Sequence, residues 1–193
     1  MTEPRVNAPT VPAPEAPASA YDMGYTKEIE HLATFAVLVA NEPGVLHRVV
    51  GLFAARGYNI DSLTVAETDP GAGTSRITIV TRGTAQVLSQ IEAQLKKMVS
   101  TRHVQDVTRD PNGVERELAL VKVRAVGSSR MEAKMLADIF RVRVIDTTPA
   151  GFIFEITGAP SKVDKFVGLM RPLGLIEVSR TGVLSIERGV ETI

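Results

Sequence analysis

Few residues of this chain have the types and spacing that catalysis or metal binding requires. The 193 residues include three histidines and no cysteine. His31, His47 and His103 are too far apart in the sequence to form the paired ligands of a helical zinc site. The absence of cysteine excludes thiol nucleophiles and thiolate metal sites, and it is typical of a reducing cytoplasm. No G-x-S-x-G, P-loop or G-x-G-x-x-G motif occurs, so the sequence predicts no catalytic residues and no metal site.

The segment Asn41–Leu46 is the most informative one for binding. It reads Asn-Glu-Pro-Gly-Val-Leu and connects an apolar run to an amphipathic one. Amides at a helix N-terminus lack intrahelical acceptors and attract a carboxylate, and Gly44 has no Cβ to keep a ligand away from the backbone. The Asn41 amide could cap the helix and also contact the ligand. The alternative, which local physics favours, is that this segment is only a well-capped helix start.

Asn59 is a second polar candidate, placed just before an alternating apolar pattern. In the predicted β-α-β-β-α-β order, the strand that begins near Asn59 starts at one end of the sheet. The helix that follows Asn41 starts at the opposite end. The two asparagines therefore cannot meet within one subunit, but they can meet across a symmetric dimer whose sheets pair edge to edge. The alternative is that Asn59 is only a turn residue.

Residues 31–110 alternate between strand and helix patterns in the order β-α-β-β-α-β. Alternation or a short apolar run predicts strands at 31–40, 59–68, 76–82 and 103–109. The first helix is predicted by an i, i+3, i+4, i+7 stripe ended by Gly57, and the second by a similar stripe. The two stripes are Leu46, Val49, Val50 and Phe53, and Leu88, Ile91, Leu95 and Met98.

The same order recurs in residues 111–193, after the turn-forming Asp110-Pro111-Asn112-Gly113. Strands are predicted at 118–125, 142–147, 152–157 and 176–186, the last interrupted at Thr181-Gly182. The helical faces are Met135, Leu136 and Ile139, and Val163, Phe166, Val167 and Met170. Ser129 with Glu132, and Ser161 with Asp164, have capping-box spacing. We predict an α+β fold of two ferredoxin-like βαββαβ sandwiches.

Composition limits the remaining function classes. Residues 1–30 hold five of the 11 prolines, which predicts a disordered tail. Lys+Arg and Asp+Glu are both 22, so the net charge of zero argues against binding nucleic acid or an anionic membrane. The longest apolar stretch is too short to cross a bilayer, and no secretory signal pattern is visible. Strand 31–40 is apolar on both faces, so we expect its second face to be buried, most simply in a homo-oligomer built through the sheets.

The stretch Val37–Val65 resembles the ACT domain of the regulatory (small) subunit of acetolactate synthase, also called acetohydroxyacid synthase. Its specific part is Arg56–Val65, Arg-Gly-Tyr-Asn-Ile-Asp-Ser-Leu-Thr-Val, whereas Glu-Pro-Gly-Val-Leu alone is typical of ACT domains in general. Arg116–Val123 and Gly151–Gly158 resemble the same family. The resemblance covers about residues 31–190 and implies an ACT domain at 31–110, followed by the family's C-terminal ferredoxin-like domain at 111–193.

The resemblance implies a non-catalytic, cytoplasmic subunit that carries no cofactor. In this family the small subunit binds and activates a large subunit, which holds thiamine diphosphate, Mg²⁺ and FAD. The large subunit condenses two pyruvates, or pyruvate with 2-oxobutyrate, at the start of branched-chain amino acid synthesis. The small subunit forms homodimers through its ACT domains and confers feedback inhibition, usually by valine.

Carried over to this chain, the effector site combines residues of two subunits: Asn41, Gly44, Val45 and Leu46 from one, and Asn59 and Ile60 from its dimer mate. Amides around Val45 and Leu46 are expected to bind the effector carboxylate. The two asparagines are expected to accept from its ammonium group and donate to its carboxylate. Ile60, alone or together with Leu46, would line a small apolar pocket.

Three alternatives belong to other functions. The first is an ACT-domain amino-acid sensor that regulates a different biosynthetic enzyme. The second is a transcriptional sensor, which would need a helix-turn-helix or a basic ribbon, and neither is evident. The third is a small ferredoxin-like enzyme, for which His47 with Glu42, or Asp61, would be the candidate catalytic groups.

Overall fold

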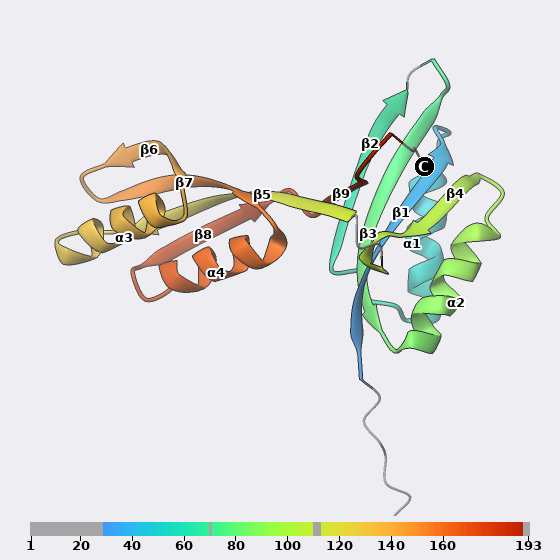
Figure 1. Ribbon diagram of the computed structural model, residues 1–193, viewed down its shortest axis with the longest axis horizontal. Helices are drawn as coiled ribbons and strands as arrows, with labels where there is room; N and C mark the ends of the chain where they lie inside the picture. The colour runs from blue at the N-terminus through green and yellow to red at the C-terminus, as the bar shows by residue number, and fades with distance from the viewer. Residues whose placement is uncertain (1–28, 70, 110–112, 191–193) are drawn as a thin grey trace, which may run out of the picture.

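The computed structural model describes residues 29–69, 71–109 and 113–190 (Figure 1). Residues 1–28 of the predicted tail lie outside this range. So does the predicted domain boundary between residues 110 and 111. No helix in the described ranges is long and apolar enough to cross a membrane. The description that follows concerns two α+β units, one on each side of residues 110–112.

The N-terminal unit has the predicted β-α-β-β-α-β order. Its elements are β1 (His31–Ala40), α1 (Val45–Arg56), β2 (Ser62–Asp69), β3 (Thr74–Gly83), α2 (Ala85–Lys96) and β4 (Thr101–Asp106). The strands form an antiparallel sheet in the order β2-β3-β1-β4, and both helices lie on one face (Figure 1). Helix α1 ends at Gly57 in the left-handed conformation, as predicted. The predicted last strand is shorter, because Val107–Arg109 forms a 3₁₀ turn, η1.

The C-terminal unit repeats this order and adds one strand. Its elements are β5 (Gly113–Arg124), α3 (Ser128–Ile139), β6 (Arg143–Thr148), β7 (Gly151–Gly158), α4 (Pro160–Met170), β8 (Leu175–Arg180) and β9 (Leu184–Glu187). The sheet order is β6-β7-β5-β8, and β9 pairs with the first residues of β5. The predicted fold class of two ferredoxin-like sandwiches is confirmed.

Each unit has its own core between its sheet and its helices. In the N-terminal unit, alternate residues of β1 such as Phe35 and Val37 pack against Val49 and Phe53 of α1 and Leu95 of α2. In the C-terminal unit, the core is centred on aromatic contacts of Phe166 with Phe154 and Phe140. The predicted stripe of α4 is confirmed, because Val163, Phe166 and Met170 are fully buried.

The second face of the N-terminal sheet is buried by the chain itself. Thr34, Ala36 and Thr78 point away from the helices and yet are almost fully buried. The ribbon formed by β9 and the start of β5 lies against this face (Figure 1), where Arg76 Nη2 donates to the Ser185 carbonyl at 2.8 Å. The predicted burial is therefore correct, but it does not require another copy of the chain. The edge strands β2 and β4 have no further strand beside them in the described sheet.

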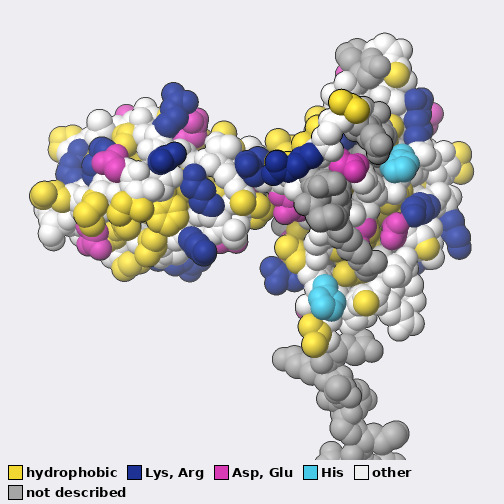
Figure 2. Space-filling view, viewed as in Figure 1, with side chains coloured by type: hydrophobic (Ala, Val, Ile, Leu, Met, Phe, Trp, Pro, Cys, Tyr) yellow, Lys and Arg dark blue, Asp and Glu magenta, His cyan; other side chains and the backbone are white. Residues whose placement is uncertain are grey.

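Two local predictions for the C-terminal helices are wrong. Both N-caps lack a side-chain hydrogen bond, so neither predicted capping box forms. Gly127 and Ala159 occupy the N-cap positions, and Asp164 forms an ion pair with Arg180 instead. In α3 the buried residues are Ala133 and Ala137, whereas Met135 and Ile139 of the predicted stripe are exposed. Figure 2 shows hydrophobic side chains gathered on the α3 side of this unit.

Candidate functional site

The turn between β1 and α1 presents the start of a helix to open space. The backbone amide of Asn41 donates to the Gly73 carbonyl at 2.8 Å, which ties the end of β1 to the β2–β3 turn. Gly44 is the N-cap of α1, with φ at +85°. A Cβ built on Gly44 would have no atom within 4 Å, so the space beside its backbone is free. Glycine is favoured here by its conformation and also leaves room for a ligand.

The N-terminus of α1 retains its positive partial charge. No acidic residue lies in the first helical turn, and Glu42 just outside it pairs with Arg48 at 3.7 Å. The Val45 amide donates to the Glu42 carbonyl at 3.3 Å, so it is already engaged in a turn. The Leu46 amide, one residue later in the first turn, has no preceding helical carbonyl to bind. An effector carboxylate would therefore meet the Leu46 amide more readily than the Val45 amide.

The two apolar candidates beside Gly44 differ in exposure. The Val45 side chain is 5% exposed and belongs to the N-terminal core. Leu46 is 41% exposed on the outer surface of α1. Only Leu46 of this pair can present its side chain to a ligand. The buried Val45 side chain instead anchors the start of α1 in the core.

Asn41 is held by a residue that sequence reasoning missed. Its side-chain amide donates to Glu67 Oε1 at 3.1 Å, and it does not cap α1. This leaves Asn41 Oδ1 as an acceptor. The turn-forming composition of residues 69–73 was the available signal. A hairpin there places the ends of β2 and β1 on the two sides of the start of β3, where the Glu67 side chain reaches Asn41.

Asn59 repeats this arrangement at the other end of the sheet. Its side-chain amide donates to Asp61 Oδ1 at 3.2 Å, and its backbone carbonyl accepts from Thr81 Oγ1 at 2.8 Å. Arg82 Nε binds the second Asp61 oxygen at 2.6 Å, which raises the pKa of Arg82. Ile60 is half-buried and packs against the N-terminal core. The side-chain amide of each asparagine thus donates to a neighbouring carboxylate, and its side-chain oxygen Oδ1 stays free to accept.

The six candidate residues form two separate groups within one chain. Thr81, which binds the Asn59 carbonyl, pairs with Ala33, seven residues before Ala40 on β1. At about 3.3 Å per residue this spans about 23 Å of strand. The structure therefore brings Asn41, Gly44, Val45 and Leu46 together at one end and places Asn59 and Ile60 at the other.

The groups proposed for an enzyme do not assemble into a reaction centre in the described chain. Glu42 pairs with Arg48, and Asp61 pairs with Arg82 and Asn59. His47 lies on the exposed side of α1. Among residues 29–69, 71–109 and 113–190, no group of three or more His, Asp or Glu side chains is placed to hold a metal ion.

Comparison with known proteins assigns both halves of the chain. Residues 35–103 match the family described as the AHAS small subunit-like ACT domain, and residues 116–189 match the small subunit of acetolactate synthase. The acetolactate synthase small subunit of Haemophilus influenzae is 47% identical over 159 residues, which cover 82% of this chain and 96% of that protein.

The chain therefore belongs to the acetolactate synthase small-subunit family.

Other members support the same assignment. The small subunit of acetolactate synthase isozyme 3 of Escherichia coli is 45% identical over 155 residues, covering 80% of this chain and 94% of that protein. The crystal structure of the small subunit from Thermotoga maritima is 40% identical, with a TM-score of 0.73 over 83% of this chain and 99% of that one. The predicted family is thus confirmed, and a small subunit with an ACT domain is a regulatory chain.

Proposed function

We propose that this chain activates the large, catalytic subunit of acetolactate synthase and makes it sensitive to feedback inhibition by valine. Family membership supports the partnership with a large subunit. The observation that carries the effector site is the start of α1 at Gly44. It faces open space, has no acidic residue in its first turn, and lies next to the free side-chain oxygen Oδ1 of Asn41. In this proposal the protein acts in the cytoplasm, and thiamine diphosphate, Mg²⁺ and FAD belong to the large subunit.

The proposed site requires a homodimer, and the topology suggests how one would complete it. The edge strand β2 starts near Asn59 and ends near Glu67, which binds Asn41. Antiparallel pairing of two β2 strands about a twofold axis would set the start of one beside the end of the other. Asn59 and Ile60 of one subunit would then approach Asn41 and Gly44 of its mate.

Each part of valine has a complementary group in this arrangement. The carboxylate would face the Leu46 amide and the positive end of α1. The ammonium group would donate to the free carbonyl oxygens of Asn41 and Asn59. Leu46 and the half-buried Ile60 would contact the branched side chain. A methylene more or less in such a pocket changes binding by about 1–3 kcal/mol, so leucine and isoleucine would bind more weakly.

Inhibition requires that valine and the large subunit prefer different arrangements of the small-subunit dimer. A coupling free energy of about 1–3 kcal/mol would change activity or affinity by about 5- to 150-fold. The proposed function thus makes binding and inhibition two separable properties of this chain.

Reconstitution tests the proposal directly. The full chain is mixed with an acetolactate synthase large subunit, and acetolactate formation is measured with and without valine. We expect this chain alone to form no acetolactate, its addition to raise the large-subunit rate, and valine to lower that rate. Failure to raise the rate would contradict the role as activator. Activation that valine, leucine and isoleucine all leave unchanged would contradict the effector assignment and favour a sensor of another metabolite.

A further inference from the structure

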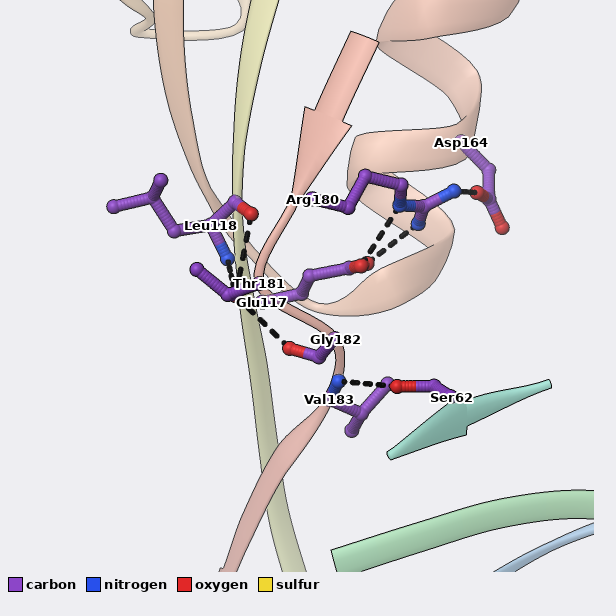
Figure 3. Close-up of polar contacts among 8 residues, drawn as sticks. All are labelled: Ser62, Glu117, Leu118, Asp164, Arg180, Thr181, Gly182 and Val183. Carbon is purple, nitrogen blue, oxygen red and sulfur yellow. Dashed lines mark hydrogen bonds and ion pairs between the residues drawn. The ribbon is translucent and has the colours of Figure 1, made fainter. Parts of the chain in front are cut away.

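The segment between β8 and β9 joins the C-terminal unit to the N-terminal sheet. Figure 3 shows Thr181, Gly182 and Val183, the connecting segment, running from the end of β8 to Ser62 at the start of β2. The Val183 amide donates to Ser62 Oγ at 3.2 Å, and Thr64 Oγ1 donates to the Val183 carbonyl at 3.3 Å. Both backbone groups of Val183 therefore bind hydroxyl groups of β2.

Gly182 lies unusually close to two side chains of β2. Its φ is +84°, and a Cβ at this position would lie 2.4 Å from Ser62 Oγ and 3.0 Å from Thr64 Cγ2. Conformation and space both require glycine here. Any larger residue must displace the Ser62 hydroxyl, which accepts the hydrogen bond from Val183.

On its other side, the connecting segment is fixed to the C-terminal sheet. Thr181 exchanges two hydrogen bonds with Leu118: the Thr181 amide donates to the Leu118 carbonyl at 3.0 Å, and the Leu118 amide donates to Thr181 Oγ1 at 3.2 Å. The preceding Arg180 binds both oxygens of Glu117, and it also reaches Asp164 on α4 at 2.7 Å (Figure 3). Because Glu117 is only 4% exposed, this pair anchors the segment firmly. Hydrogen bonds and ion pairs therefore tie the segment to β5 and α4.

The start of β2 is also where the proposed effector residue Asn59 lies. Asn59 binds Asp61, and the next residue, Ser62, binds Val183. An ammonium group at Asn59 Oδ1 would lie beside the Asp61 carboxylate and compete with Arg82 for it. A cleft of about 420 Å³ between the units is lined by Asp61, Ser62 and Gly182, among others.

We propose that the contact of Ser62 with the connecting segment transmits effector binding from Asn59 to the C-terminal unit. This inference rests on the proposed function. In it, Ser62 and Gly182 are positioning residues that touch no effector. They set the orientation of the C-terminal unit, and the effector changes that orientation by rearranging Asp61. Loss of this contact uncouples inhibition from valine binding.

Two variants and one control test the inference in the full chain. Ser62→Ala removes the hydroxyl that accepts from Val183, and Gly182→Ala places a methyl group where that hydroxyl lies. Ser179→Ala, an exposed serine of β8, is the matched control. Three quantities are measured for each: valine affinity of the free small subunit by calorimetry, activation of the large subunit without valine, and inhibition of the assembled enzyme at saturating valine.

We expect both variants to bind valine within about threefold of the wild type and to activate the large subunit. Valine inhibition should be at least fivefold weaker in both, which is the lower end of ordinary allosteric coupling. The control should behave as the wild type in all three measurements. Wild-type inhibition of the Ser62→Ala and Gly182→Ala enzymes would overturn the inference alone. A wild-type chain that binds no valine would overturn the proposed function, and this inference with it.

Discussion

Glu67 Oε1 accepts the side-chain amide of Asn41 at 3.1 Å, at the end of β2 that lies beside the start of α1. This bond fixes the rotation of the Asn41 amide, so that its carbonyl oxygen is the group left for a ligand. The same arrangement recurs at Asn59 with Asp61. Because a carboxylate accepts from the NH₂ group of each asparagine, both side chains present their oxygen to a ligand, and this oxygen can accept from an ammonium group.

Glu67→Ala should weaken valine binding by about fivefold, because losing the orienting bond costs about 1 kcal/mol. The variant should still activate the large subunit. Calorimetry with the free small subunit measures the affinity. Glu92→Ala, which removes a carboxylate that pairs with Lys96 on α2, serves as the control. Unchanged affinity in Glu67→Ala would show that Asn41 needs no such orientation.

Gly44→Asp should abolish valine sensitivity and leave activation intact. It sets a negative charge where the effector carboxylate should bind, and it also adds strain at a φ of +85°. Gly44→Ala separates the two effects, because it adds only the strain of about 1–2 kcal/mol. Gly51→Asp adds the same charge on α1 at another glycine whose Cβ would meet open space. Inhibition curves decide the matter, and a Gly44→Asp enzyme that valine still inhibits places the site elsewhere.

Complementation between Asn41→Ala and Asn59→Ala tests whether the site is shared by two subunits. Each homodimer should bind valine at least tenfold more weakly than the wild type. A mixed dimer should regain one intact site, because the Asn59→Ala chain supplies Asn41 and the Asn41→Ala chain supplies Asn59. Co-expression with two affinity tags isolates the mixed dimer for calorimetry. A mixed dimer with no recovered site would refute sharing, since a site within one chain would stay damaged in both copies.

Glu117→Gln should lower the free energy of unfolding by about 1.5–3 kcal/mol, the usual contribution of hydrogen bonds to charged groups. Glu117 is 4% exposed and binds Arg180 through both oxygens, and this bonding raises the pKa of Arg180. Asp164→Asn removes the exposed partner of the same arginine and should cost only about 0–1 kcal/mol. Urea denaturation compares the two variants. Equal destabilisation would mean that burial of Glu117 does not strengthen the pair.

The sequence alone determined the repeated order of strands and helices and the position of Asn41–Leu46 between the first strand and the first helix. These features depend on neighbours within about one helical turn or two strand residues. The apolar run of β1 and the end of α1 at Gly57 are examples, although Leu46 and Val50 of the stripe predicted for α1 are exposed. The motif Arg56–Val65 also identified the family, because a motif is defined by the order of amino acids and not by how they pack.

Tertiary structure decided how distant segments meet. The Ser62–Val183 contact joins residues 121 positions apart, and Asn41 meets Glu67 across a hairpin. Asp164 has the spacing of a helix cap but binds Arg180, because β8 passes beside α4. Met135 and Ile139 of the stripe expected for α3 face outward, because that helix buries Ala133 and Ala137 against its sheet. Local pattern fixes which side of an element is apolar, whereas the identity of the element that covers it depends on the path of the whole chain.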